Sequence, residues 1–232
     1  MRVAVQFYRD RRSRLLGVTV VCLALCLVTA TRAAAEGEGD ARWKLGVGPI
    51  AGGLVFDPGL GNYRWDIGPA LQSGLQATVY HGRFAAGARV WRTQTTQSSG
   101  IPGETQSPRV NLIGIDATGQ MRAVSLVGVE LSVLAHTGIL HLGYDPDRLS
   151  YDPSGTGSQI TVEYKPITEW EFGGGIELRR ELTGYMALAV QADTSTFALD
   201  TAHRRGGEIV EERERFLSWS FRFQLSWLFT LG

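Results

Sequence analysis

Apolar and polar positions alternate with a period of two along most of the chain, most clearly at its end. From Leu217 to Leu231 every odd position carries a bulky apolar side chain, and the even positions are small or polar, with Leu228 the exception. A β-strand places successive side chains on opposite faces, whereas a helix would scatter these aromatics around its circumference. The alternation therefore predicts a strand with one apolar and one polar face.

The same alternation predicts seven earlier strands, and the connections between strands alternate between short and long. Short hairpins are expected at 81–82, near 123 and near 182, because two or three residues suffice to reverse an antiparallel pair. Short turns at one end and long loops at the other are typical of a transmembrane barrel with periplasmic turns and extracellular loops. The expected strands cover 43–56, 65–80, 83–96, 109–122, 125–140, about 160–180, 184–197 and 215–231, and the longer loops cover 57–64, 97–108, 141–159 and 198–214.

The side chains on the two faces decide between a membrane barrel and a soluble one. In a soluble eight-stranded barrel the apolar face points inward and the polar face meets water. Here the apolar face holds the bulky aromatics, and the polar face is rich in Gly, Ala and Ser with a few charges. An eight-stranded barrel is just wide enough for side chains to fill it, so these aromatics would overfill the interior. The sequence therefore predicts an all-β fold, an eight-stranded antiparallel up-and-down transmembrane β-barrel whose aromatics face lipid.

The first 35 residues have the composition of an export signal. Six arginines surround an apolar run at 15–30, and the small residues 33–35 follow. The run of about 16 residues is short for a helix that spans a bilayer, which needs about 20. We expect a signal peptide at 1–35, cleaved after Ala35, and one barrel domain at 36–232. Both cysteines, Cys22 and Cys26, lie in the apolar run, so the exported chain would have no disulfide and no thiol nucleophile.

Composition and charge narrow the classes of partner. The chain has 23 basic and 23 acidic side chains, and because six arginines lie in the expected signal peptide, the exported part is mildly acidic. Nucleic-acid binding needs a basic surplus, so no nucleic-acid partner is expected. Glycine supplies 29 of 232 residues, well above the usual share of about 7%, which suits a narrow interior filled by small side chains.

The final strand carries a pattern that resembles the assembly signal of outer-membrane barrels: polar, any, Gly, any, any, aromatic, any, hydrophobic. Gln224, Phe229 and Leu231 match it, whereas Ser226 stands where glycine is usual and Gly232 replaces a terminal aromatic. With the eight strands, this ending resembles the small Gram-negative outer-membrane barrels, a family that includes the OmpA membrane domain, OmpX and OmpW. The resemblance implies export to the outer membrane, insertion by its assembly machinery, and outer-membrane lipid and lipopolysaccharide as surroundings.

Four charges are expected to point into the lumen at comparable depth: Arg89, Asp116, Glu130 and Arg222. Counting from a turn near 123 places Asp116 opposite Glu130, and adjacent carboxylates repel. Buried charges need partners, so we expect Arg89 or Arg222 to bridge the two carboxylates, or one carboxylate to be protonated. These charges could simply plug the barrel, or they could line a gate or narrow conduit.

Catalytic and metal-binding patterns are weak. The lipid A deacylase-like family of small barrels uses a His-x-Ser pair, but the residues that follow His136 and His141 include no such serine. We expect no catalysis, no cofactor and no metal, and we interpret the aspartates at 145, 147 and 152 as a solvated loop rather than a calcium site. Three functions remain: an interaction barrel whose loops bind an extracellular or envelope partner, a channel or OmpW-like conduit for small molecules, and a surface lipid A hydrolase.

Overall fold

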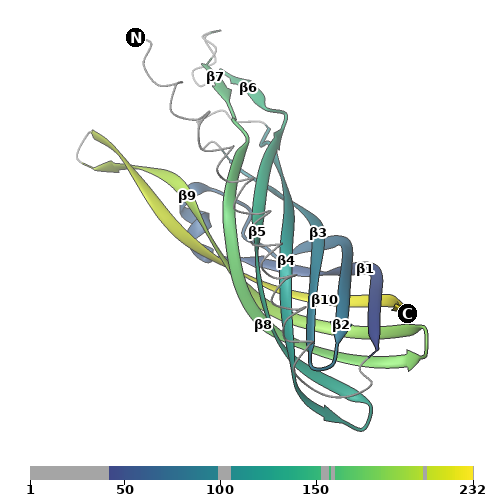
Figure 1. Ribbon diagram of the computed structural model, residues 1–232. Helices are drawn as coiled ribbons and strands as arrows, with labels where there is room; N and C mark the ends of the chain where they lie inside the picture. Colours follow the sequence, from purple (N-terminus) through teal and green to yellow (C-terminus); the bar gives the residue numbers. More distant parts are fainter. Residues whose placement is uncertain (1–41, 99–105, 153–156, 158–159, 206–207, 232) are drawn as a thin grey trace.

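The computed structural model describes residues 42–98, 106–152, 157, 160–205 and 208–231, and its strands form a closed antiparallel barrel (Figure 1). Around the barrel the strand order is β1-β10-β9-β8-β5-β4-β3-β2. Each barrel strand pairs with its neighbour in the barrel order, and Trp43 opposite Leu231 begins the pairing of the first strand with the last. The barrel strands are β1 (Trp43–Phe56), β2 (Ala70–His81), β3 (Phe84–Thr96), β4 (Arg109–Leu126), β5 (Val129–Asp145), β8 (Ile167–Thr183), β9 (Met186–Arg205) and β10 (Glu208–Leu231).

The two faces of the sheet lie as the alternation predicts. The bulky apolar residues of β10 are exposed on the outside, and Arg222, Gln224 and Ser226 are buried in the lumen. Leu228, the exception in the pattern, also faces inward and is buried. A closed sheet with an apolar outer face has no free edge and can satisfy its backbone within lipid. The structure confirms the predicted fold class.

The turn between β4 and β5 lies later in the chain than the sequence suggested. It is formed by Val127 and Gly128, both with positive φ, at 50° and 78°. Consequently Asp116 pairs with Gly138, and the expectation that it lies opposite Glu130 is wrong. A register shift between Arg122 and Val124 interrupts the alternation before the strand ends. The sequence pattern did not reveal the true turn, because a valine in the left-handed region is rare.

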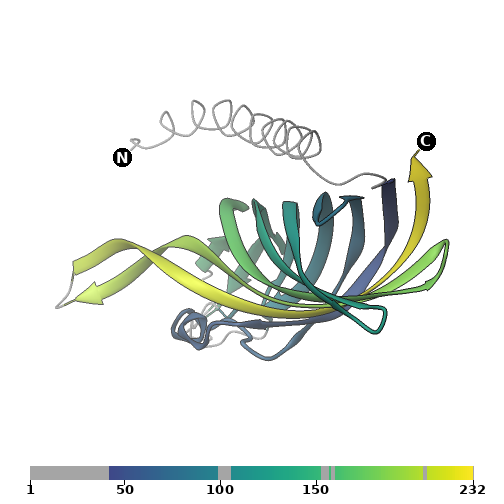
Figure 2. The ribbon, with the colours of Figure 1, turned by 60° about the horizontal axis from the view of Figure 1, so that its bottom comes forward.

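The long connections contain more regular structure than expected. The short strands β6 (Arg148–Tyr151) and β7 (Ile160–Glu163) form a hairpin within the predicted loop 141–159 and its C-terminal flank. Strands β9 and β10 continue to pair beyond the barrel wall, through most of the predicted loop 198–214. Figures 1 and 2 show this β9–β10 hairpin projecting away from the rest of the barrel. Backbone hydrogen bonds extend an antiparallel pair without an apolar face, so the sequence pattern did not reveal it.

The first long connection contains a 3₁₀-helix, η1 (Pro58–Tyr63), at the barrel end opposite the short turns. The predicted second strand began at Trp65, but Trp65 makes only an isolated bridge to Gln97, and β2 begins at Ala70. No helix among the described residues is both long and apolar enough to cross a bilayer.

Candidate functional site

The centre of the lumen holds a buried cluster of two arginines and two aspartates. Arg89 Nε lies 2.5 Å from Asp116 Oδ2, and Arg89 Nη1 lies 3.1 Å from Asp193 Oδ2. Arg222 forms a second ion pair with Asp193. All four residues are at most 5% exposed. The Arg89–Asp116 and Arg222–Asp193 pairs each join neighbouring strands, whereas the Arg89–Asp193 pair crosses the interior from β3 to β9.

Neutral donors also contact the aspartates, and the buried Glu171 lies close enough to Asp116 to interact with it. Trp91 Nε1 donates to Asp116 Oδ2 at 3.0 Å, and Ser220 Oγ donates to Asp193 Oδ1 at 2.6 Å. Gly138, directly beside Asp116, leaves the space that the carboxylate occupies, because a Cβ there would lie 2.4 Å from Asp116 Oδ1. The glycines of the polar face thus make room for charged side chains in a narrow interior.

A second polar layer lies between this cluster and the short turns. Glu177 Oε2 accepts hydrogen bonds from Gln120 Nε2 at 3.0 Å and from Gln191 Nε2 at 2.7 Å. Gln191 Nε2 also reaches Gln76 Oε1 at 3.4 Å on the opposite wall. Because these side chains come from four strands and are buried, the layer closes the lumen in cross-section.

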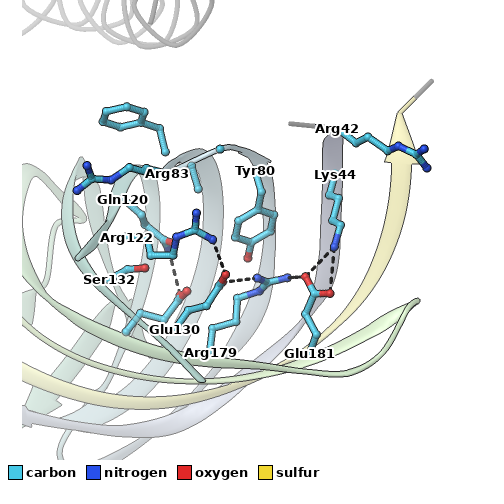
Figure 3. A pocket seen from close by; sticks show the side chains of 14 residues that line it. Arg42, Lys44, Tyr80, Arg83, Gln120, Arg122, Glu130, Ser132, Arg179 and Glu181 are labelled. Carbon is cyan, nitrogen blue, oxygen red and sulfur yellow. Dashed lines mark hydrogen bonds and ion pairs between the residues drawn. The ribbon is translucent and has the colours of Figure 1, made fainter. Parts of the chain in front are cut away.

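A third layer forms a chain of alternating charges across the mouth at the short-turn end (Figure 3). Glu130 accepts from Arg122 and from Arg179, each at 2.7 Å. Glu181 then accepts from Arg179 at 2.8 Å and from Lys44 at 2.9 Å. The chain runs from β4 through the neighbouring strands β5 and β8, and its last pair, Lys44 with Glu181, joins β8 to β1, which is not its neighbour in the barrel.

The opposite half of the lumen is apolar. Leu60 of η1 is fully buried there, beneath the projecting β9–β10 hairpin, and Tyr63 packs edge-on against Phe216. The cluster includes Ile50, Leu54, Phe56, Leu60, Trp65, Trp91, Val110, Leu112, Leu140, Leu142, Phe197, Leu199 and Phe216. This apolar layer was not predicted, because the sequence argument assigned bulky apolar side chains to the outside.

The four lumen charges expected from the sequence separate into two layers. Arg89, Asp116 and Arg222 lie in the central cluster, whereas Glu130 lies at the mouth with Arg122 and Arg179. The expected bridge from an arginine to both Asp116 and Glu130 is absent from the described ion pairs, because the displaced turn leaves Glu130 two residues from the end of the barrel. The alternation alone did not identify Asp193, Glu177 and Arg179 as members of these polar layers. The sequence feature that could have identified these residues is a charged side chain at an inward position in the interior of a strand.

The residues of the assembly-signal pattern occupy both faces of β10. Gln224 and Ser226 are buried in the lumen, and Phe229 and Leu231 are exposed on the outer face. A Cβ at Gly48 would lie 1.8 Å from Leu225 O and 2.9 Å from Ser226 Cα, so the glycine at this position lets β1 approach β10 closely beside Ser226.

Histidine and serine do meet in the lumen, but not in catalytic geometry. His136 Nε2 lies 3.3 Å from Ser195 Oγ and 3.8 Å from Asp193 Oδ1. A catalytic triad needs the serine on one ring nitrogen and the carboxylate on the other, whereas here both contacts fall on Nε2 and Nδ1 has no partner among the described residues. Within the same described ranges no three His, Asp or Glu side chains are grouped as a metal site requires.

No protein-family model matches the chain, and no curated protein matches its sequence. Solved structures with a similar arrangement include Neisserial surface protein A, with a TM-score of 0.47 and 11% identity over 82% of this chain and 99% of that one. A major outer membrane protein of Thermus thermophilus matches with a TM-score of 0.45 and 10% identity, over 81% of this chain and 99% of that one. OprG of Pseudomonas aeruginosa matches with a TM-score of 0.43 and 8% identity, over 84% and 99%. By its own closed strand order, its apolar outer face and the buried charges in its lumen, the chain has the fold of a small outer-membrane β-barrel.

Proposed function

We propose that this chain is a closed, non-catalytic outer-membrane barrel that acts through its extracellular hairpins. The filled lumen is the observation that carries this proposal. Charged and amide side chains close one half, and packed apolar side chains close the other. Such an interior supports a structural or interaction role, since the described side chains leave no continuous polar path for an ion.

The projecting β9–β10 hairpin is the best candidate for the interaction surface. Strand β8 pairs with β9 only as far as Phe197, and β1 pairs with β10 only as far as Ser218. Beyond these points the two strands pair only with each other, from Ala198 opposite Arg215 to Arg205 opposite Glu208. Both backbone edges of the hairpin are therefore free of other described strands and can meet a partner outside the cell.

Basic side chains at the same end suit the surrounding lipid. Arg64, Arg92 and Arg109 are exposed, and each could donate charge-assisted hydrogen bonds to lipopolysaccharide phosphates. His203, Arg204 and Arg205 belong to the projecting hairpin, but their side chains lie outside the described part of the structure.

Conductance tests the closed lumen. The mature chain, refolded in a planar bilayer with insertion verified, should show no single-channel steps. Glu130→Ala should also stay silent, because the Glu177 layer and the apolar half still close the lumen. Steady conductance of the wild-type chain would refute the closed barrel.

Site-specific photocrosslinking in intact cells tests the interaction surface. A photoreactive residue at the exposed position Glu211 in the hairpin should give discrete adducts with a surface lipid or a second protein. The matched control is Val127, which is 97% exposed at the short-turn end. The same adducts at both positions would remove the hairpin as the interaction surface.

A conduit for small apolar molecules is the second candidate, supported by a separation in the barrel wall. Residues 167–170 of β8 lie beyond the last pair with β9, and Arg213 of β10 joins this segment to β9 by contacting both Glu169 and Asp200. The buried apolar cluster lies at the same end. If the conduit operates here, Arg213→Ala should speed cellular uptake of an apolar fluorescent dye relative to wild type. Equal uptake would argue against it.

A further inference from the structure

The short-turn end of the barrel contains a pocket that the proposed function does not use. It encloses about 320 Å³, within the range of roughly 300–1,000 Å³ typical of ligand pockets. Its lining comes from β1, β2, β3, β4, β5 and β8, so the whole barrel mouth builds it rather than one hairpin. Its floor includes Gln120 and Glu177, whose hydrogen-bonded layer closes the lumen beneath it. The pocket is therefore blind and opens at the short-turn end of the barrel, the end expected to face the periplasm (Figure 3).

Cations outnumber anions in the lining. Five basic side chains face three carboxylates, which leaves an excess of two positive charges. The basic residues are Arg42, Lys44, Arg83, Arg122 and Arg179, and the acidic residues are Glu130, Glu177 and Glu181. An excess of this kind inside a concave, partly desolvated site attracts an anion more strongly than scattered surface charge does.

Several guanidinium donors remain available. Arg122 is 37% exposed at its side chain, and its described ion pair uses only Nη1, which contacts Glu130. Arg179 is almost fully buried and its Nη1 and Nη2 already contact Glu130 and Glu181, so it contributes its charge to the pocket rather than an available donor. Arg42 and Arg83 form no ion pair with any other described residue and lie on opposite sides of the mouth in Figure 3. Unpaired donors around a cavity with surplus positive charge are the features of an oxyanion site.

We propose that this pocket binds a phosphate group from the periplasmic side, held mainly by Arg122 and Arg83. Planar guanidinium groups match phosphate oxygens in pairs, and a phosphate monoester near neutral pH carries close to the two negative charges that the pocket lacks. A carboxylate would supply only one. The Lys44–Glu181 pair on the opposite wall keeps the pocket open by holding Lys44 to β8.

Two sources could present such a phosphate. A soluble phosphate ester could enter from the periplasm. A lipid headgroup of the adjacent leaflet could also reach the mouth, because Trp43 stacks on His81 and Phe84 is exposed at this end, where aromatic residues typically mark the membrane interface.

Titration of glycerol 3-phosphate into the mature chain, refolded in an uncharged detergent, tests the proposal by calorimetry. Saturable binding is expected, and it should weaken about tenfold in R83Q and in R122Q, because each loses a charge-assisted contact. The matched control is R180Q, an exposed arginine of β8 that lies beside Arg179 in the chain but does not line the pocket, and it should bind as wild type. Variants are compared only if their urea unfolding midpoints agree with that of wild type. R83Q breaks no described ion pair, so it is the variant expected to fold normally and to decide the test.

Absence of saturation at millimolar ligand would overturn the proposal, as would equal weakening in R180Q. Equally tight binding of acetate would overturn the assignment to phosphate. Adding phosphatidic acid to the detergent distinguishes the sources. Displacement of glycerol 3-phosphate by the lipid would identify a lipid headgroup as the source of the phosphate. Unchanged binding would identify a soluble ester as the source. Both results support a phosphate site. Photocrosslinking at the distant hairpin is independent of either outcome.

Discussion

Asp193→Asn removes one buried negative charge from the central cluster with little change in volume. Asp193 forms ion pairs with both Arg89 and Arg222. After the substitution Arg89 keeps Asp116 at 2.5 Å, whereas Arg222 keeps a hydrogen bond from its Nη1 to Gln72 Oε1 at 3.3 Å and the electrostatic attraction of Asp116 and Glu171, with neither of which it forms a described ion pair. The loss therefore falls on one arginine that is 2% exposed and whose Nε already lacks a partner among the described residues.

The expected cost follows from these contacts. A unit charge pair at 3.1 Å, the Arg89–Asp193 distance, is worth about 5 kcal/mol at an effective dielectric constant of about 20. Breaking a buried ion pair by removing one partner typically destabilises a protein by about 3–5 kcal/mol. We therefore expect the free energy of unfolding to fall by about 3–5 kcal/mol, which lowers the ratio of folded to unfolded protein by at least about two orders of magnitude.

Urea unfolding of the refolded barrel in lipid vesicles, followed by tryptophan fluorescence, measures this loss as a lower midpoint at unchanged slope. The control is Asp200→Asn on the same strand. Asp200 is 77% exposed at its side chain and pairs with Arg213 at the surface, so its loss should cost about 0–1 kcal/mol. Equal free energies of unfolding for the two variants would refute the argument that the central ion pairs act as buried charges.

Gly173→Ala should destabilise the barrel by about 1–3 kcal/mol in the same assay, because a Cβ there would lie 2.6 Å from His136 Nε2. The control Gly119→Ala should be close to neutral, because a Cβ at Gly119 would have open space around it. Phe229→Ala should slow insertion by purified outer-membrane assembly machinery while leaving detergent refolding almost unchanged; an equal loss in both would mean that Phe229 acts only by packing. Mass spectrometry of the exported chain should give a mature protein that lacks residues 1–35, and a retained leader would contradict cleavage after Ala35.

The placement of the lumen charges shows what can be predicted by counting residues from an expected turn and what cannot. Inward orientation followed from the alternation alone, and Arg89, Asp116 and Arg222 all lie inside. Their partners did not follow, because Arg89 and Asp193 are 104 positions apart in the chain and meet only across the closed lumen. Counting along a hairpin can relate neighbouring strands only, and it fails when the turn is displaced, as at Val127–Gly128.

The sequence by itself determined the eight strands, the face that meets lipid and the end that carries short turns. These are local properties, since the two-residue period of a strand assigns every side chain to a face without reference to the rest of the chain. The tertiary structure alone decided the ion-pair partners, the apolar packing beneath η1 and the pocket at the mouth. Each depends on which inward side chains face one another across the barrel, and that is settled only when closure sets the register of all eight strands together.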